Sequence, residues 1–189
     1  MDAPQGVYAG SVIGKSDTAF WDAFSPRVYV KGALVLHMLR AVVGDSTFFT
    51  IMRDYLNDRR LRYSSARTED FVAACENAYG KSLKWFFDEW VYNSLDSIDR
   101  PGYEYHWHVT RDGSRDSVAV YLRQTTADQF IFRMPMTLTL VDGTSEQSFS
   151  IIDSLAEQTF LLVTETVPTD VLVDKDHAVF KVLTAREEH

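Results

Sequence analysis

The sequence has few of the residues that mark several classes of protein. It contains one cysteine, Cys75, in 189 residues, which excludes a fold held together by internal disulfides. No stretch approaches the roughly 18–20 consecutive apolar residues of a membrane-spanning helix. Basic residues are also the minority, since 19 Lys and Arg stand against 27 Asp and Glu. Surfaces that bind nucleic acid need clustered Lys and Arg, so we expect no nucleic-acid partner and no membrane span in this chain.

What the chain does have is ample apolar material and two different periodicities. Apolar residues make up 46% of the sequence and aromatic residues 13%, enough for packed cores. Up to about residue 100 the apolar residues recur mostly at helical spacing, and beyond Pro101-Gly102 they alternate as in strands. The length fits one or two domains. We therefore predict an α+β chain in which a helical part, residues 1–100, precedes a β part, residues 101–189.

Four helices joined by short connections are expected in the first part. They cover residues 28–43, 46–60, 69–79 and 83–93. Gly44 and Gly80 follow two of these segments and are typical helix ends. Asp45, Thr68 and Ser82 stand just before the three later segments, where their side chains would cap the first turns.

The second part is predicted to form a small antiparallel sandwich of about seven short strands, similar to an immunoglobulin (Ig-like) domain. The strands cover residues 103–111, 117–124, 130–141, 147–153, 159–165, 170–174 and 178–183. Asp112-Gly113 and Asp142-Gly143 are turn signals between them. Pro135 interrupts the third strand, which indicates an edge position or a bulge.

The opening helix holds two residues whose roles are not obvious. Lys31 falls on the same stripe as Val35, Met38 and Val42, and the ordinary expectation is that its stem packs on the core while its ammonium reaches water. Tyr29 faces another side and is followed at helical spacing by Gly32 and Ala33. Two readings are open: a buried, hydrogen-bonded tyrosine against which another helix packs, or a phenol presented to a cavity as a donor.

Several motifs, in this order, resemble the aminopeptidase N-like zinc metallopeptidases. "RVYVKGALVLHMLRAVVGDSTFF" looks like the family's Tyr-x-Lys-Gly-Ala helix with the Gly-Asp and Phe that follow it. "RTEDFVAACENAYGKSLKWFFDEWV" is similar to its Thr-x-(Asp/Glu)-Asp-Phe segment, Gly-x-x-Leu step and Phe-Phe-x-x-Trp helix. The strand-rich tail resembles the sandwich domain that follows the catalytic domain. The sequence after Trp90 lacks the family's Gly-apolar-Pro step.

The resemblance implies a zinc-dependent aminopeptidase that hydrolyses N-terminal residues from peptides. Residues 1–100 would be the C-terminal helical part of its catalytic domain, and the matching tyrosine, Tyr29, would be catalytic: its hydroxyl points at the oxyanion formed when zinc-bound water attacks the scissile carbonyl. Lys31 would be structural. The family binds zinc through H-E-x-x-H, but none of the five histidines here is followed by glutamate. We therefore expect the peptide-hydrolysing parent to contain zinc, this chain to lack the zinc-binding half, and the chain alone to be inactive.

Two other interpretations remain open, a non-catalytic protein-interaction module and a degenerate family member. His106 and His108 share one strand face and could provide two metal ligands, although an exposed sheet face is the more ordinary explanation. Cys75 is expected to be a small buried thiol. The aromatic cluster on the fourth helix is expected to be core; it comprises Trp85, Phe86, Phe87 and Trp90. The sequence does not indicate the preferred substrate residue, the compartment or the oligomeric state.

Overall fold

A computed structural model describes residues 11–13, 24–25, 27–93, 100–112, 115–126 and 130–188. The chain divides into two compact units, Met1–Asp96 and Ser97–His189, each described by itself below. The first is helical and the second consists of two small sheets, so the predicted α+β class is confirmed. Within the described residues, no helix has the length and apolar character needed to cross a membrane.

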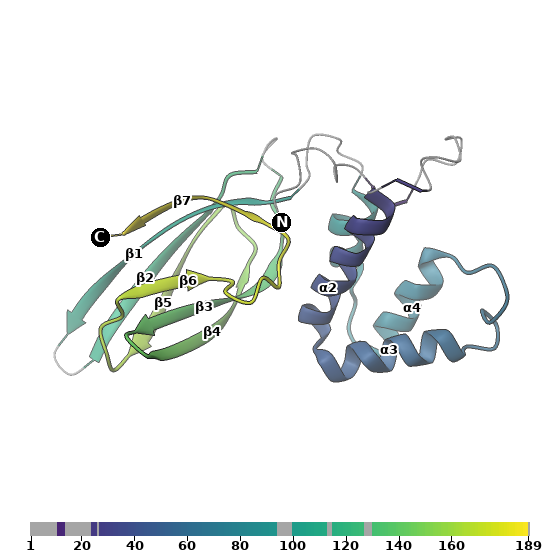
Figure 1. Ribbon diagram of the computed structural model, residues 1–189, viewed down its shortest axis with the longest axis horizontal. Helices are drawn as coiled ribbons and strands as arrows, with labels where there is room; N and C mark the ends of the chain where they lie inside the picture. The colour runs from purple at the N-terminus through teal and green to yellow at the C-terminus, as the bar shows by residue number, and fades with distance from the viewer. Residues whose placement is uncertain are drawn as a thin grey trace. The chain divides into compact units, whose positions relative to one another are not determined.

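The helical unit begins with a π-helical turn that continues directly into an α-helix. The turn η1 spans Arg27–Lys31 and α2 spans Gly32–Val43, followed by α3 (Asp45–Asn57), α4 (Thr68–Tyr79), α5 (Lys84–Phe87) and the π-helical η2 (Asp88–Tyr92). Figure 1 shows α3 running across the ends of both α2 and α4, and α3 contacts both of them. The segment of α5 and η2 returns against α2.

Aromatic and aliphatic side chains from each helix form the core of this unit. Tyr55 of α3 meets Phe71 of α4 edge to face with ring centroids 5.1 Å apart, and Phe71 meets Phe87 at 6.3 Å. Burial of such rings is the main stabilising contribution in a small helical unit. The core prediction for the fourth segment is confirmed for Phe86, Phe87 and Trp90, each at most 2% exposed, whereas Trp85 is half-buried.

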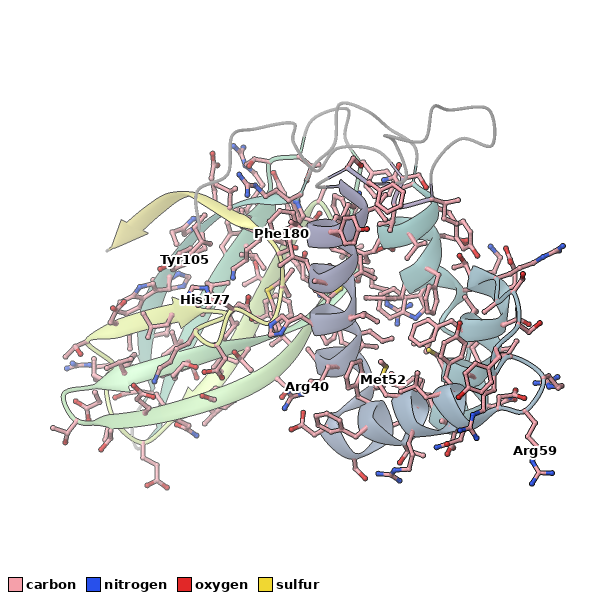
Figure 2. All side chains as sticks on the ribbon, turned by 45° about the vertical axis from the view of Figure 1, so that its right-hand side comes forward. Arg40, Met52, Arg59, Tyr105, His177 and Phe180 are labelled. Carbon is pink, nitrogen blue, oxygen red and sulfur yellow. The ribbon has the colours of Figure 1, made fainter. Side chains whose placement is uncertain are left out.

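The N-caps of α3 and α4 differ from the predicted residues, Asp45 and Thr68. Asp45 lies inside the first turn of α3, where its carboxylate pairs with Arg40 at 2.7 Å, and the N-cap is Gly44. Figure 2 shows Arg40 near the end of α2, from which it reaches the start of the next helix. Thr68 is the first residue of α4, and Asp70 stabilises that start instead by accepting a hydrogen bond from the Arg67 N–H at 2.9 Å. The predicted end at Gly44 is confirmed, with φ of 81°.

Ser82 makes a weaker contribution to its helix than predicted. The N-cap of α5 is Leu83, and the Ser82 hydroxyl accepts a hydrogen bond from the Lys84 N–H at 3.3 Å. The stronger acceptor is Glu76 of α4, whose Oε1 receives the Leu83 N–H at 2.7 Å and the Ser82 hydroxyl at 2.9 Å. A carboxylate from one helix therefore satisfies the open donors before the next.

The described residues of the second unit form seven strands in two sheets (Figure 1). One sheet has the order β5-β2-β1-β7 and the other has the order β4-β3-β6. The strands are β1 (Gly102–Asp112), β2 (Arg115–Gln124), β3 (Met134–Asp142), β4 (Ser145–Asp153), β5 (Glu157–Thr164), β6 (Asp170–Val173) and β7 (Val182–Glu188). All pairs are antiparallel except β1 with β7, which is parallel and was not predicted.

Alternate residues of both sheets point into one shared core. On β1 these are Tyr103, Tyr105 and Trp107, and on β3 they are the buried Met134, Met136 and Leu138. Tyr105 lies among the strands in Figure 2, and its hydroxyl donates to the Val171 carbonyl of β6 at 3.1 Å. That bond joins the two sheets directly.

Two details of the strands differ from the sequence-based expectation. Pro135 lies in β3, the middle strand of its sheet, but β6 pairs with β3 only from Leu138 onward, so Pro135 faces no strand on that side. The last predicted strand, 178–183, begins instead at Val182. The reason is Asp174, whose buried carboxylate accepts hydrogen bonds from the Ala178 and Val179 N–H groups, each at 3.0 Å, and an ion pair from Lys181. These bonds hold residues 174–181 in a compact loop.

The turn at Asp142-Gly143 is present, with β3 and β4 paired on either side of it and Gly143 at φ of 58°. The turn at Gly113 lies outside the described residues. The segment after Asn93, where the family step is missing from the sequence, also lies mostly outside them.

Candidate functional site

Tyr29 lies in the π-helical turn η1, and its phenol is open to solvent. The residue is 59% exposed, so the reading of a buried, hydrogen-bonded tyrosine is wrong for this unit. Its ring lies 6.2 Å from that of Phe24, which is 50% exposed. Both rings are thus on an accessible side of the turn.

The backbone beneath Tyr29 is held by Ser25. The Ser25 carbonyl accepts the Val28 N–H at 3.0 Å and the Tyr29 N–H at 3.3 Å. Single π-helical turns are rare and are enriched at functional sites, because the widened turn changes the direction of one side chain. The π-helical turn therefore agrees with a Tyr29 side chain that points to solvent rather than packing in the core.

The two small residues after Tyr29 keep the neighbouring space open. Ala33 is exposed, and among the described residues a Cβ placed on Gly32 would meet only the Val12 side chain, at 3.9 Å. Such a distance is ordinary van der Waals contact. Since Tyr29 is 59% exposed, a ligand could approach the phenol.

Lys31, two residues later, is buried on the opposite side. It is 4% exposed and lies on the face that also buries Val35, Met38 and Leu39. The expectation that its ammonium reaches water is therefore wrong. At about 100° per residue, positions 29 and 31 point in opposite directions, which explains why one side chain is free to act on a ligand while the other belongs to the interior.

The remaining candidate groups do not form a second reactive site. Cys75 is buried, as predicted, and burial in the apolar core raises the pKa of its thiol to about 12, with a smaller effect from the Glu76 charge. His106 is half-buried and stacks on Tyr121 with ring centroids 4.6 Å apart, while His108 is exposed on the same strand. They lie on the outer face of β1, in agreement with the structural interpretation.

Three comparisons identify what this chain is similar to. Residues 10–90 match the family model of the Peptidase family M1 domain. A probable aminopeptidase 1 from Sulfurisphaera tokodaii is 31% identical over 113 residues, which cover 58% of this chain and 13% of that relative. Aminopeptidase M1-A from Oryza sativa subsp. japonica is 37% identical over 71 residues, which cover 38% of this chain and 8% of that protein.

A solved structure shows the same fold over nearly the whole chain. The crystal structure of Legionella pneumophila aminopeptidase A in complex with aspartic acid superposes with a TM-score of 0.68 at 17% identity. It covers 93% of this chain and 20% of that one. The succession of a helical unit and a two-sheet unit is thus also found in that structure. Residues 10–90 thus resemble the M1 peptidase domain, and the aminopeptidase relatives are similar to the same chain. It spans about an eighth of the length of the first relative it matches.

Resemblance to this family implies zinc in the whole protein, but the described residues do not fit a zinc site. No three His, Cys, Asp or Glu side chains among them lie close enough together to hold a metal ion. His37, the histidine nearest to Tyr29 in the sequence, is followed by Met38 rather than glutamate. What these residues do offer is a hydrogen-bond donor on an accessible turn.

Proposed function

We propose that this chain is part of a zinc-dependent aminopeptidase that hydrolyses N-terminal residues from peptides. The observation that supports it most is the match of residues 10–90 to the M1 domain, since this segment contains the π-helical turn that holds Tyr29. The aminopeptidases that share up to 37% identity with the chain support the same class of substrate.

In this proposal Tyr29 is the catalytic residue that the chain contributes. Its phenol O–H would donate a hydrogen bond to the oxygen of the scissile carbonyl as negative charge develops there. A fixed donor aimed at charge that exists only in the transition state lowers the barrier by about 3–4 kcal/mol. The exposure of Tyr29 and its anchored backbone at Ser25 fit this role, because the donor must reach a ligand without being covered by its own helix.

Zinc and the base that activates water would come from residues other than those described here. The absence of H-E-x-x-H from the sequence supports this assignment. The proposal therefore places zinc in the whole protein, expects no catalytic zinc in this chain, and expects the chain alone to be inactive. The zinc would supply Lewis acidity and an activated water.

The principal rival is a non-catalytic interaction module, either unrelated in activity or a degenerate family member. Exposed apolar side chains on the helical unit favour it, among them Phe24, Val30, Phe49 and Leu56. The same exposure is expected of helices that pack against another part of a larger enzyme. An activity measurement separates the two.

The test uses the whole protein that contains this chain, and the chain of residues 1–189 in parallel. Each is incubated with a peptide amide that releases a fluorophore, once with a free N-terminal amine and once with that amine acetylated. We expect the whole protein to cleave only the free amine, to lose activity in a zinc chelator and to regain it with zinc. Hydrolysis by the 189-residue chain alone at the same rate, or none by the whole protein, would contradict the proposal.

A further inference from the structure

A buried carboxyl group connects the two sheets of the second unit, and nothing in the proposed peptidase reaction uses it. Asp153 is the last residue of β4 and is 0% exposed. Its Oδ2 accepts a hydrogen bond from the side-chain amide of Gln124, the last residue of β2. The two strands belong to different sheets, so this bond crosses the core.

The amide of Gln124 cannot turn away from the carboxyl group. Its Oε1 accepts the Phe132 N–H at 2.9 Å, and its Nε2 also donates to the Phe132 carbonyl at 2.7 Å. Both ends of the amide are therefore fixed by one backbone residue. The donor that remains is directed at Asp153, which makes the position of the acceptor a fixed feature of the core.

Among the described residues, the groups found to interact with Asp153 carry no charge. Tyr103 of β1 is the titratable neighbour, and its phenol favours the ionised form of the carboxyl group. Gln124 of β2 and the Phe132 backbone are neutral, and no cation contributes to its titration. Burial of an ionised carboxylate without a positive partner is costly, because the core replaces water around the charge.

We propose that Asp153 is a proton-binding site between the two sheets, and that its protonation makes the second unit more stable in mildly acidic solution. When neutral, the carboxyl group still accepts the Gln124 amide and gains a donor of its own. When ionised, it must remain in the same apolar position because β4 and β2 both hold it there.

The direction of the pH effect follows from the titration of the buried group. Burial raises the pKa of Asp153 from 3.8 to about 6, and the interactions of the carboxylate with Gln124 and Tyr103 only partly offset that rise. The folded state therefore binds the proton more tightly than the unfolded chain. Stability should increase as the pH falls from about 6 towards 4, and the penalty of the buried charge should be fully present above pH 6. Most carboxylates that are paired in a fold have the opposite effect.

The first test measures the proton directly in the unmodified 189-residue chain. The ¹³Cγ resonance of Asp153 is followed by NMR between pH 3.5 and 8, ranges chosen to span about two units on either side of the expected midpoint. We expect a midpoint near 6 for Asp153. A midpoint at or below 4 would overturn the proposal.

The second test compares the variants D153N and D176N with the unmodified chain. Asparagine resembles the neutral carboxyl group, while Asp176 is an exposed carboxylate of the same unit and serves as the control. Amide exchange of β2 and β4 at pH 5 and 7.5 reports the opening of this unit alone. We expect exchange, corrected for its intrinsic pH dependence, to be several-fold faster at pH 7.5 in the unmodified chain and in D176N, and equal at both values in D153N. An unchanged pH dependence in D153N would contradict the proposal, and the NMR midpoint decides the question if that variant does not fold.

Discussion

Tyr29 and Lys31 are two residues apart, yet 59% of the first is exposed and only 4% of the second. The difference decides what each can do. An exposed phenol can donate to a ligand, whereas a buried lysine contributes its stem to the helix interior and can be removed only at the expense of folding. Of these two residues, Tyr29 and not Lys31 is therefore the candidate for contact with a ligand.

The burial of Cys75 predicts how slowly its thiol reacts. Because burial raises the pKa of its thiol to about 12, almost none of it is thiolate at pH 8. We expect a thiol-specific reagent to label the folded chain about 10³-fold more slowly than the chain unfolded in urea at the same pH. Mass spectrometry of quenched samples measures both rates. Equal rates would show that the thiol is accessible and that α4 is not packed as described.

The connection between α4 and α5 is stabilised by Glu76, a residue of α4. Its carboxylate accepts the Leu83 N–H and the Ser82 hydroxyl, and these hydrogen bonds lower its pKa from 4.5. We expect Glu76→Ala to destabilise the helical unit by about 1 kcal/mol above pH 5, as measured by urea unfolding. Because the folded pKa is lowered, the contribution should be lost as the pH falls below 4.5.

The matched control for that variant is Asp54→Ala, which removes an exposed carboxylate from α3. Its effect should stay within about 0.5 kcal/mol at every pH. If both variants lose the same stability, the hydrogen bonds of Glu76 are not what connects α4 to α5.

At the scale of the whole molecule, the division near residue 96 predicts independent behaviour of the two units. Limited proteolysis should cut preferentially between Asn93 and Gly102, where Ser, Asp and Pro cluster in the sequence. The two-sheet unit should survive as a folded fragment, identified by its mass and by circular dichroism. A single cooperative unfolding transition together with resistance to cutting in this segment would contradict the division.

Much of this architecture is predictable from sequence because periodicity reports burial directly. The alternation of Tyr103, Tyr105 and Trp107 with polar residues identifies β1, and Gly44 identifies the end of α2. Periodicity does not indicate hydrogen bonds between polar groups that are several residues apart in the sequence. Glu76 accepts a hydrogen bond from an N–H group seven residues later in the chain. Asp174 accepts hydrogen bonds that fold the next residues into a loop, although their apolar side chains alternate as in a strand.

The candidate site was only partly predictable for a related reason. The motif around Tyr29 identifies the residue, but no apolar pattern indicates that it lies in a π-helical turn. Asp153 carries no sequence signal at all, since an aspartate after a strand is an ordinary turn residue. Its partner Gln124 lies 29 positions away.

The most direct measurement of the central proposal is the turnover of Tyr29→Phe in the whole protein, with Tyr63→Phe as the control. Tyr63 is 95% exposed on the same unit and also loses only a hydroxyl. If Tyr29 donates to charge that forms only in the transition state, kcat should fall about 10²–10³-fold while KM and the melting temperature change little. Tyr63→Phe should keep full activity. A Tyr29→Phe enzyme with unchanged kcat would contradict the assignment of Tyr29 as the catalytic donor.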